Sequence, residues 1–145
     1  MNAILSFIAI ALRLSTPLSY AALGGYCSER SGTVNIALEG MMLMGAFTAA
    51  VVAHHTHNPY FGLCAGIGGG ITLALLHGFL CIELRANQII SGMAVNFIAL
   101  GLPPVISKAL YDSSGGTPML EVSSRIPGLL GLSPLALGVI AMTAA

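Results

Sequence analysis

Two long stretches without Asp, Glu, Lys or Arg constrain this chain more than any other feature. One runs from Gly40 to Ile82 and the other from Ala86 to Ser107. A helix needs roughly 20 mostly apolar residues to cross a hydrocarbon core about 30 Å thick. The first stretch is long enough for two such helices and the second for one. Because lipid offers no partners to an open backbone, and no strand-like alternation is present, we expect α-helices.

The overall composition also indicates an integral membrane protein. Only 7% of the 145 residues are charged and 56% are hydrophobic, whereas a soluble domain carries about a quarter charged residues. The formal net charge is zero, and no basic stripe suggests a nucleic-acid partner. The hydrophobicity continues far beyond the N-terminus, so the pattern is not that of one cleavable signal peptide before a soluble domain.

Five hydrophobic segments can be drawn, which predicts an all-α, polytopic transmembrane bundle in one domain covering residues 1–145. The first segment contains Arg13 and Pro17, and Pro17 favours a kink or a break because it removes a backbone donor. The fifth segment is still apolar at the last residue of the sequence. The predicted segments are residues 4–26, 34–53, 60–82, 88–106 and 129–145.

The basic residues of the short connections predict the orientation of the bundle. Arg30 and Arg85 lie in the first and third connections, and the second connection has no Lys or Arg. An excess of basic residues marks cytoplasmic loops, which favours a cytoplasmic first and third connection and an outside N-terminus. Arg13, together with Lys108 and Arg125 of the long fourth connection, argues for the opposite orientation.

Glycines spaced four apart predict a close helix contact in the third segment. Gly62, Gly66 and Gly70 fall on one face of a helix. Such a face forms a groove that another helix backbone can approach, so we assign these three residues to helix packing. Contact with a substrate is the alternative for this face.

The second segment contains a single carboxylate, Glu39. A charged side chain costs about 3 kcal/mol at the centre of a membrane helix, so Glu39 should face protein or water. Asn35 is four residues earlier and is expected on the same helical face. Two interpretations are open. Asn35 and Glu39 line a polar pathway or hold a helix break beside it, or Glu39 lies near the membrane interface and pairs with Arg30.

The fourth segment carries a polar stripe. Gln88, Gly92 and Asn96 follow one another at four-residue spacing, with Ser91 near them. Such a stripe faces a translocation pathway or forms hydrogen bonds between helices. We assign Gln88 to hydrogen bonding and Asn96 to the pathway. The candidate substrate-pathway residues are Asn35, Glu39, Ser91 and Asn96.

No catalytic or metal-binding constellation is predicted. His54, His55 and His57 share one loop, but no carboxylate or cysteine is placed with them, so they are weak metal candidates. An intramembrane protease or transferase needs a nucleophile with a base, or a metal, at membrane depth. The candidates for that alternative are scattered over three segments, and neither a GxSx nor an HExxH motif is present. The scattered candidates are Ser91, His77 and Glu39.

Two stretches of the chain resemble a known family. The first covers residues 12–18, 22–25 and 28–47, the last part reading SERSGTVNIALEGMMLMGAF, and the second covers residues 85–101, RANQIISGMAVNFIALG. They closely resemble the inner-membrane permeases of bacterial nucleoside and simple-sugar ABC importers, part of a wider group that also serves branched-chain amino acids and ribose. The pattern E-R-x-G-x-x-N-I-x-x-E-G-x-M-L carries most of the similarity. Ala37 stands where the family commonly has Gly.

The resemblance implies a permease subunit that forms part of the translocation path in the bacterial plasma membrane. It would pair with a second permease subunit, a cytoplasmic ATP-binding-cassette ATPase and an extracytoplasmic substrate-binding protein. The chain itself would need no cofactor, because the ATPase binds ATP, and it has no Walker-type GxxxxGK[ST] motif. Among substrates, the resemblance favours nucleosides, then simple sugars, then branched-chain amino acids.

Permeases of this family are about twice as long as this chain, and their cytoplasmic coupling segment lies in the second half. The resemblance therefore implies the N-terminal half of a permease, without the coupling segment and the later helices. Such a piece is not expected to transport on its own. The alternative function for the 145 residues is a non-transporting structural membrane fragment.

Overall fold

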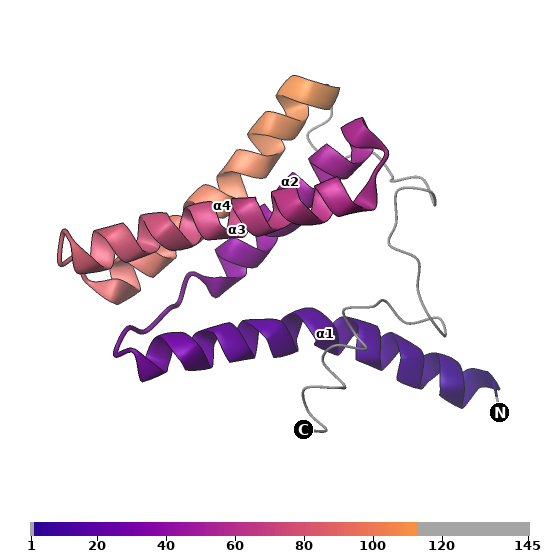
Figure 1. Cartoon of the computed structure of the whole chain (residues 1–145), viewed down its shortest axis with the longest axis horizontal. Coiled ribbons are helices and arrows are strands. Elements are labelled where there is room, and N and C mark those ends of the chain that lie inside the picture. Colours follow the sequence, from indigo (N-terminus) through magenta and orange to yellow (C-terminus); the bar gives the residue numbers. More distant parts are fainter. Residues whose placement is uncertain (1, 113–145) are drawn as a thin grey trace.

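The computed structural model of this protein describes residues 2–112, which form four helices in an up-and-down order (Figure 1). All regular secondary structure in this part of the chain is helical, which confirms the predicted all-α fold. The predicted fifth segment, residues 129–145, lies outside the described residues. The four helices are α1 (Asn2–Arg30), α2 (Leu38–Thr56), α3 (Pro59–Ile82) and α4 (Gln88–Tyr111).

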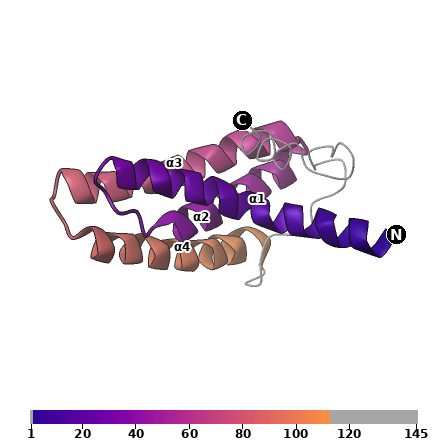
Figure 2. The ribbon, with the colours of Figure 1, turned by 90° about the horizontal axis from the view of Figure 1, so that it is seen from below.

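Three of these helices are long and apolar enough to cross a membrane, namely Ser6–Arg30 of α1, Pro59–Ile82 and Gln88–Tyr111. Helix α2 is shorter, with 19 residues, and it has Glu39 in its first turn and His54 and His55 in its last turn. At about 1.5 Å per residue it reaches about 28 Å, close to the thickness of the hydrocarbon core. It contacts all three other helices, with α3 and α4 on either side of it (Figure 2).

Residues of the polar connections cap the starts of α3 and α4 and terminate α2. The side-chain oxygen of Asn58 accepts a hydrogen bond from the Tyr60 backbone N–H, and Pro59 occupies the first helical position of α3. Asn87 caps α4 in the same way through the N–H of Ile89, at 2.9 Å. Helix α2 ends at His57, whose φ of 51° is left-handed and stops the helix.

Helix α1 is continuous through Pro17, so the predicted break into two helices does not occur. Around this position the hydroxyl groups bond to carbonyls of their own helix. The Thr16 Oγ1 donates to the Leu12 carbonyl at 2.8 Å, and the Ser19 Oγ donates to the Ser15 carbonyl at 2.9 Å. Such back-bonding satisfies a hydroxyl inside a membrane helix without help from a neighbour.

The predicted glycine face of α3 packs against α2. A Cβ atom added to Gly62 would lie 2.7 Å from the Cβ of Ala53, and one added to Gly66 would lie 3.0 Å from the Gly45 carbonyl oxygen. The approach is reciprocal, because a Cβ added to Gly45 would lie 3.1 Å from the Gly66 carbonyl oxygen. Gly70 packs less closely, because a Cβ added there would lie 3.7 Å from the Met41 carbonyl oxygen. Side chains larger than those present would therefore force α2 and α3 apart.

A small buried cluster joins α3 and α4 to the start of α2. Leu73 of α3 packs with Val95 and Ala99 of α4, and Ala37 completes the cluster just before α2. Val95, Ala99 and Ala37 are fully buried. Most other large apolar side chains of the described residues are exposed, as expected for helices whose outer faces contact lipid or further helices.

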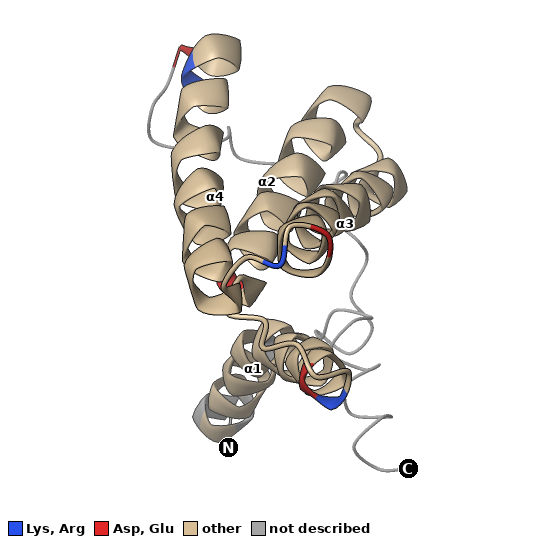
Figure 3. Cartoon of the chain, turned by 90° about the vertical axis from the view of Figure 1, so that its left-hand side faces the viewer, with Lys and Arg blue, Asp and Glu red and all other residues tan. Residues whose placement is uncertain are grey.

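Charged residues lie at the two ends of the bundle, in the connections or in the terminal turns of the helices. Arg30 and Arg85 lie at the end where α1 meets α2 and α3 meets α4, and Glu39 is at the same end (Figures 1 and 3). Lys108 and Asp112 lie at the opposite end. The first and third connections therefore share one side of the bundle, as the predicted orientation requires. That this side is cytoplasmic stays a prediction.

We predict that Gly66→Leu destabilises the full-length protein by roughly 1–3 kcal/mol or more, because the new side chain meets the α2 backbone. The measurement is the thermal unfolding midpoint in detergent. Gly68→Leu is the matched control, since nothing lies within 4 Å of a Cβ built at Gly68. Equal unfolding midpoints for the two variants would contradict the close contact.

Candidate polar site at the start of α2 and α4

Asn35 lies in the connection before α2, because α2 begins only at Leu38. The expectation that Asn35 and Glu39 share a helical face is therefore wrong. The physical reason is local: the Asn35 Oδ1 accepts a hydrogen bond from the Ala37 backbone N–H at 3.0 Å. This side chain–backbone bond competes with the helical hydrogen-bond pattern and favours a turn. The Asn35 Nδ2 lies 3.6 Å from the Met41 sulfur.

Glu39 is exposed in the first turn of α2, and not at the middle of a membrane helix. A carboxylate at this position interacts favourably with the positive end of the helix dipole. Its predicted alternative partner, Arg30, contacts Tyr26 of its own helix. The Arg30 Nη1 donates to the Tyr26 hydroxyl at 3.2 Å, and the guanidinium lies over the ring at 5.7 Å. The placement of Glu39 at a helix end favours the interfacial interpretation.

The polar stripe of α4 binds the backbone of the connection before α2. The Gln88 Oε1 accepts a hydrogen bond from the Val34 N–H at 2.8 Å, which is the interhelical role expected for Gln88. The Asn96 Oδ1 accepts from the Gly40 N–H at 2.8 Å, and the Asn96 Nδ2 donates to the Ile36 carbonyl at 3.1 Å. The stripe therefore supplies partners to backbone groups that no helix or sheet satisfies.

Ser91 is buried between α3 and α4, where it meets His77. The Ser91 Oγ and the His77 Nδ1 are 3.0 Å apart, and both residues are more than nine-tenths buried. The sulfur of Cys81 lies 3.7 Å from the His77 Nε2. His77 is thus hydrogen-bonded to a side chain of the neighbouring helix. Their burial gives the pair no open approach for a substrate and favours a structural role.

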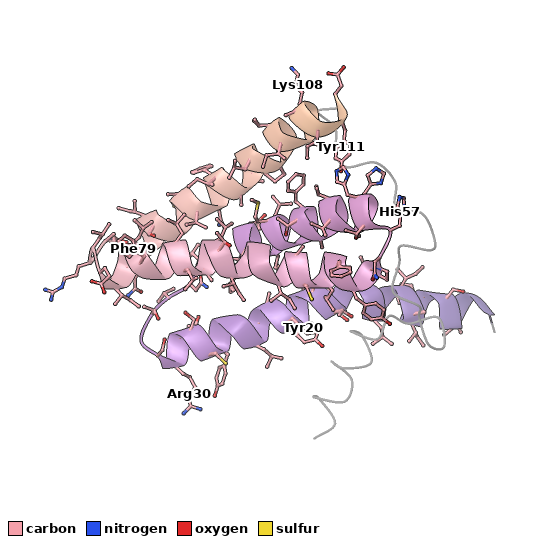
Figure 4. The ribbon with its side chains drawn as sticks, turned by 45° about the horizontal axis from the view of Figure 1, so that its top comes forward. Tyr20, Arg30, His57, Phe79, Lys108 and Tyr111 are labelled. Atoms are coloured by element: carbon pink, nitrogen blue, oxygen red, sulfur yellow. The ribbon has the colours of Figure 1, made fainter. Side chains whose placement is uncertain are left out.

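Sequence reasoning missed the pairing of Ser91 with His77, because the two residues lie on different helices and no spacing rule relates them. It also missed a second contact, at the other end of the bundle. The Tyr111 hydroxyl and the His55 Nε2 are 3.2 Å apart, and the His54 ring packs edge-on against the Tyr111 ring at 5.5 Å. Figure 4 shows Tyr111 at the end of α4 and His57 at the end of α2. These contacts join the ends of α2 and α4.

The described histidines, cysteines and carboxylates do not assemble a metal centre. Within residues 2–112, no group of three or more of these side chains is placed to hold an ion. His54 and His55 lie in the last turn of α2 and His57 directly follows it, so the expectation that the three share one loop is wrong. Their rings contact one another and Tyr111.

An apolar groove of about 460 Å³ lies between α1, α2 and α3. None of the predicted pathway residues is among the residues that line it. The role of Asn35, Glu39, Ser91 and Asn96 in a substrate pathway stays a prediction. The groove is lined chiefly by Tyr20, Met41, Met42, Gly45, Leu63 and Ile67.

We predict that Ser91→Ala destabilises the full-length protein by about 1–2 kcal/mol, because it removes the oxygen partner of a buried imidazole. The measurement is again the unfolding midpoint in detergent. Ser19→Ala is the control, since the Ser19 hydroxyl is exposed and bonds only to its own helix. If both variants unfold at the same temperature, the buried Ser91–His77 bond does not stabilise the fold.

Comparison of the sequence with known proteins places the chain in a family. Residues 7–145 match the family model described as the branched-chain amino acid transport system permease component. No solved structure matches the chain.

Curated relatives carry transporter names. The chain is 39% identical over 135 residues to the guanosine ABC transporter permease protein NupQ of Bacillus subtilis, covering 87% of this chain and 42% of the relative. It is 40% identical over 110 residues to the putative glucose ABC transporter permease protein TsgC13 of Haloferax volcanii, covering 75% of this chain and 33% of the relative. It is 33% identical over 118 residues to the nucleoside ABC transporter permease protein NupC of Lactococcus lactis, covering 77% of this chain and 37% of the relative.

The chain spans less than half the length of these relatives. The family match nevertheless covers almost the whole chain, and it agrees with the membrane-length apolar helices of the structure. The chain is therefore a multi-pass plasma membrane protein that belongs to the branched-chain amino acid transport system permease family.

Proposed function

We propose that this chain is the N-terminal part of the permease subunit of an ABC importer and forms part of the translocation path for nucleosides or simple sugars. The observation that carries the proposal is the 39% identity over 135 residues to a protein named as a guanosine permease. Transporter permeases are not normally enzymes, and we extend this to the chain, which would catalyse no covalent chemistry.

The charge distribution supports a neutral solute. No Asp, Glu, Lys or Arg occurs between Gly40 and Ile82, which covers most of α2 and all of α3. A nucleoside or a sugar presents hydroxyls and ring edges, and neutral hydrogen-bonding groups are sufficient to receive them. A zwitterionic amino acid carries two charges that need compensation in a low-dielectric site. This difference favours nucleosides and sugars over branched-chain amino acids.

A simple sugar is the second candidate, because a relative at 40% identity is named as a putative glucose permease. The nucleoside is preferred, because two of the three relatives described above carry guanosine or nucleoside in their names.

The proposed mechanism is alternating access. Partner ATPases on the cytoplasmic side would bind ATP, and their closure would move the permease helices about a central cavity. A second permease subunit would complete the path, and an extracytoplasmic binding protein would deliver the substrate. Among the described helices, α2 contacts α1, α3 and α4, so a movement of α2 would affect all three.

Uptake by the complete transporter tests this proposal. The full-length permease is assembled with its second permease, ATPase and binding protein, and uptake of radiolabelled guanosine is measured with unlabelled nucleosides, sugars or leucine as competitors. We expect nucleosides to compete best, sugars weakly and leucine not at all. Replacing the Walker lysine of the ATPase should abolish uptake.

Strong competition by leucine alone, or uptake that persists without a functional ATPase, would refute the proposed function. Supplying the 145-residue chain in place of the full-length permease should give no uptake above background, as both the proposal and the alternative of a non-transporting fragment require, so this assembly serves as the background control.

A further inference from the structure

Helix α2 lacks an N-cap of its own. The first N–H groups of a helix have no partner within the helix, and a Ser, Thr, Asp or Asn at the cap position usually supplies one. Here the cap position is Ala37, with φ −80° and ψ 4°, and it forms no side-chain capping bond. Its methyl group cannot accept a hydrogen bond, so the donors of the first turn need partners from elsewhere.

Asn96 of α4 supplies the missing cap. Its Oδ1 accepts a hydrogen bond at 2.8 Å from the N–H of Gly40, the third residue of α2. This is one of the donors that a cap side chain normally satisfies. Its Nδ2 donates to the Ile36 carbonyl at 3.1 Å, on the other side of the cap position. One amide therefore holds the backbone on both sides of Ala37.

The shape of Gly40 fits this contact. A Cβ atom at Gly40 would lie 2.7 Å from the Asn96 Oδ1 and 3.0 Å from the Asn96 Cα. Any other residue would therefore disturb the cap. Gly92, one turn before Asn96, allows a similar approach, because a Cβ there would lie 3.1 Å from the Ile36 Cβ. Gln88, one turn earlier still, adds its bond to the Val34 N–H.

We propose that Asn96 is an N-cap supplied in trans to α2, and that it acts in transport as a positioning residue rather than as a substrate ligand. Both polar atoms of its amide are bound to backbone, and the bonds fix where α2 begins relative to α4. The inference deepens the proposed function. Its test by substrate uptake rests on that function, whereas its test by thermal unfolding is independent of it.

The cap makes Asn96 and Gly40 energetically coupled. In the wild type, Gly40→Ala should destabilise the protein, because the new methyl group would lie 2.7 Å from the Asn96 Oδ1 and 3.0 Å from both the Asn96 Cα and the Ala99 Cβ. With Asn96→Ala already present, the contact with the amide oxygen is removed while the other two remain, so Gly40→Ala should cost less than in the wild type but still destabilise the protein. The combined loss should therefore be smaller than the sum of the single losses.

The experiment uses the full-length permease with its partner subunits. Unfolding midpoints without substrate are measured for Asn96→Ala, Gly40→Ala and the double variant. We expect Asn96→Ala to lower the midpoint by about 2–4 °C, and the double variant to show less than the additive loss. Gly101→Ala is the matched control for Gly40→Ala, since nothing lies within 4 Å of its built Cβ.

Competition among nucleosides and sugars supplies the second readout. For each variant, the half-inhibitory concentration of a nucleoside is divided by that of a sugar. If Asn96 positions α2, this ratio in Asn96→Ala should stay within about twofold of the wild-type ratio, while the maximal uptake rate per folded transporter falls. If Asn96→Ala does not yield folded protein, Asn96→Asp replaces it as the single variant in the midpoint and competition measurements, and the double variant is left out because Asp keeps an oxygen beside Gly40. Asp retains an acceptor for the Gly40 N–H, and we expect its midpoint to lie below that of wild type.

Three results would each overturn the inference: an unchanged unfolding midpoint in Asn96→Ala, strictly additive midpoint losses in the double variant, or a nucleoside-to-sugar ratio that changes by more than about twofold. Failure of the proposed function looks different, because the wild-type transporter then takes up neither nucleosides nor sugars. In that case the unfolding midpoints and the coupling between Asn96 and Gly40 still decide whether the cap exists.

Discussion

The close contact between α2 and α3 is the interaction on which the rest of the structure depends. Gly45 and Gly66 face each other so closely that each would place a Cβ about 3 Å from the carbonyl oxygen of the other. In a membrane the hydrophobic effect does not drive helices together, so close packing and hydrogen bonds must do so. The Thr48 hydroxyl adds a bond of 3.1 Å to the Ala65 carbonyl across the same interface.

The polar side chains of the described bundle serve mainly to satisfy the backbone and one another. Gln88 binds the connection before α2, Asn96 binds both this connection and the first turn of α2, and Ser91 binds His77 in the buried contact between α3 and α4. Unpaired polar groups are costly where water is absent, so such bonds hold the helices in one arrangement. The first three turns of α4 therefore have a structural role, and the outer face of the helix remains apolar.

Much of the fold could be predicted from the sequence. The starts of α3 and α4 were predicted within one residue, because Asn58-Pro59 and Asn87 are strong local signals. The start of α2 was predicted four residues too early, because the connection before it is also apolar and its backbone is held by Asn35 and by side chains of α4. Of the kink or break predicted at Pro17, the break does not occur, because α1 continues through it.

The sequence by itself determined that the chain crosses a membrane as helices, since uncharged stretches of this length have no stable alternative in water or lipid. It also determined which glycines share a face, because the helical repeat relates residues four apart. Only the tertiary structure decided what those faces meet. The partners of Asn96 are 56 and 60 residues away, and no local spacing rule connects positions that far apart, because their meeting depends on how whole helices pack.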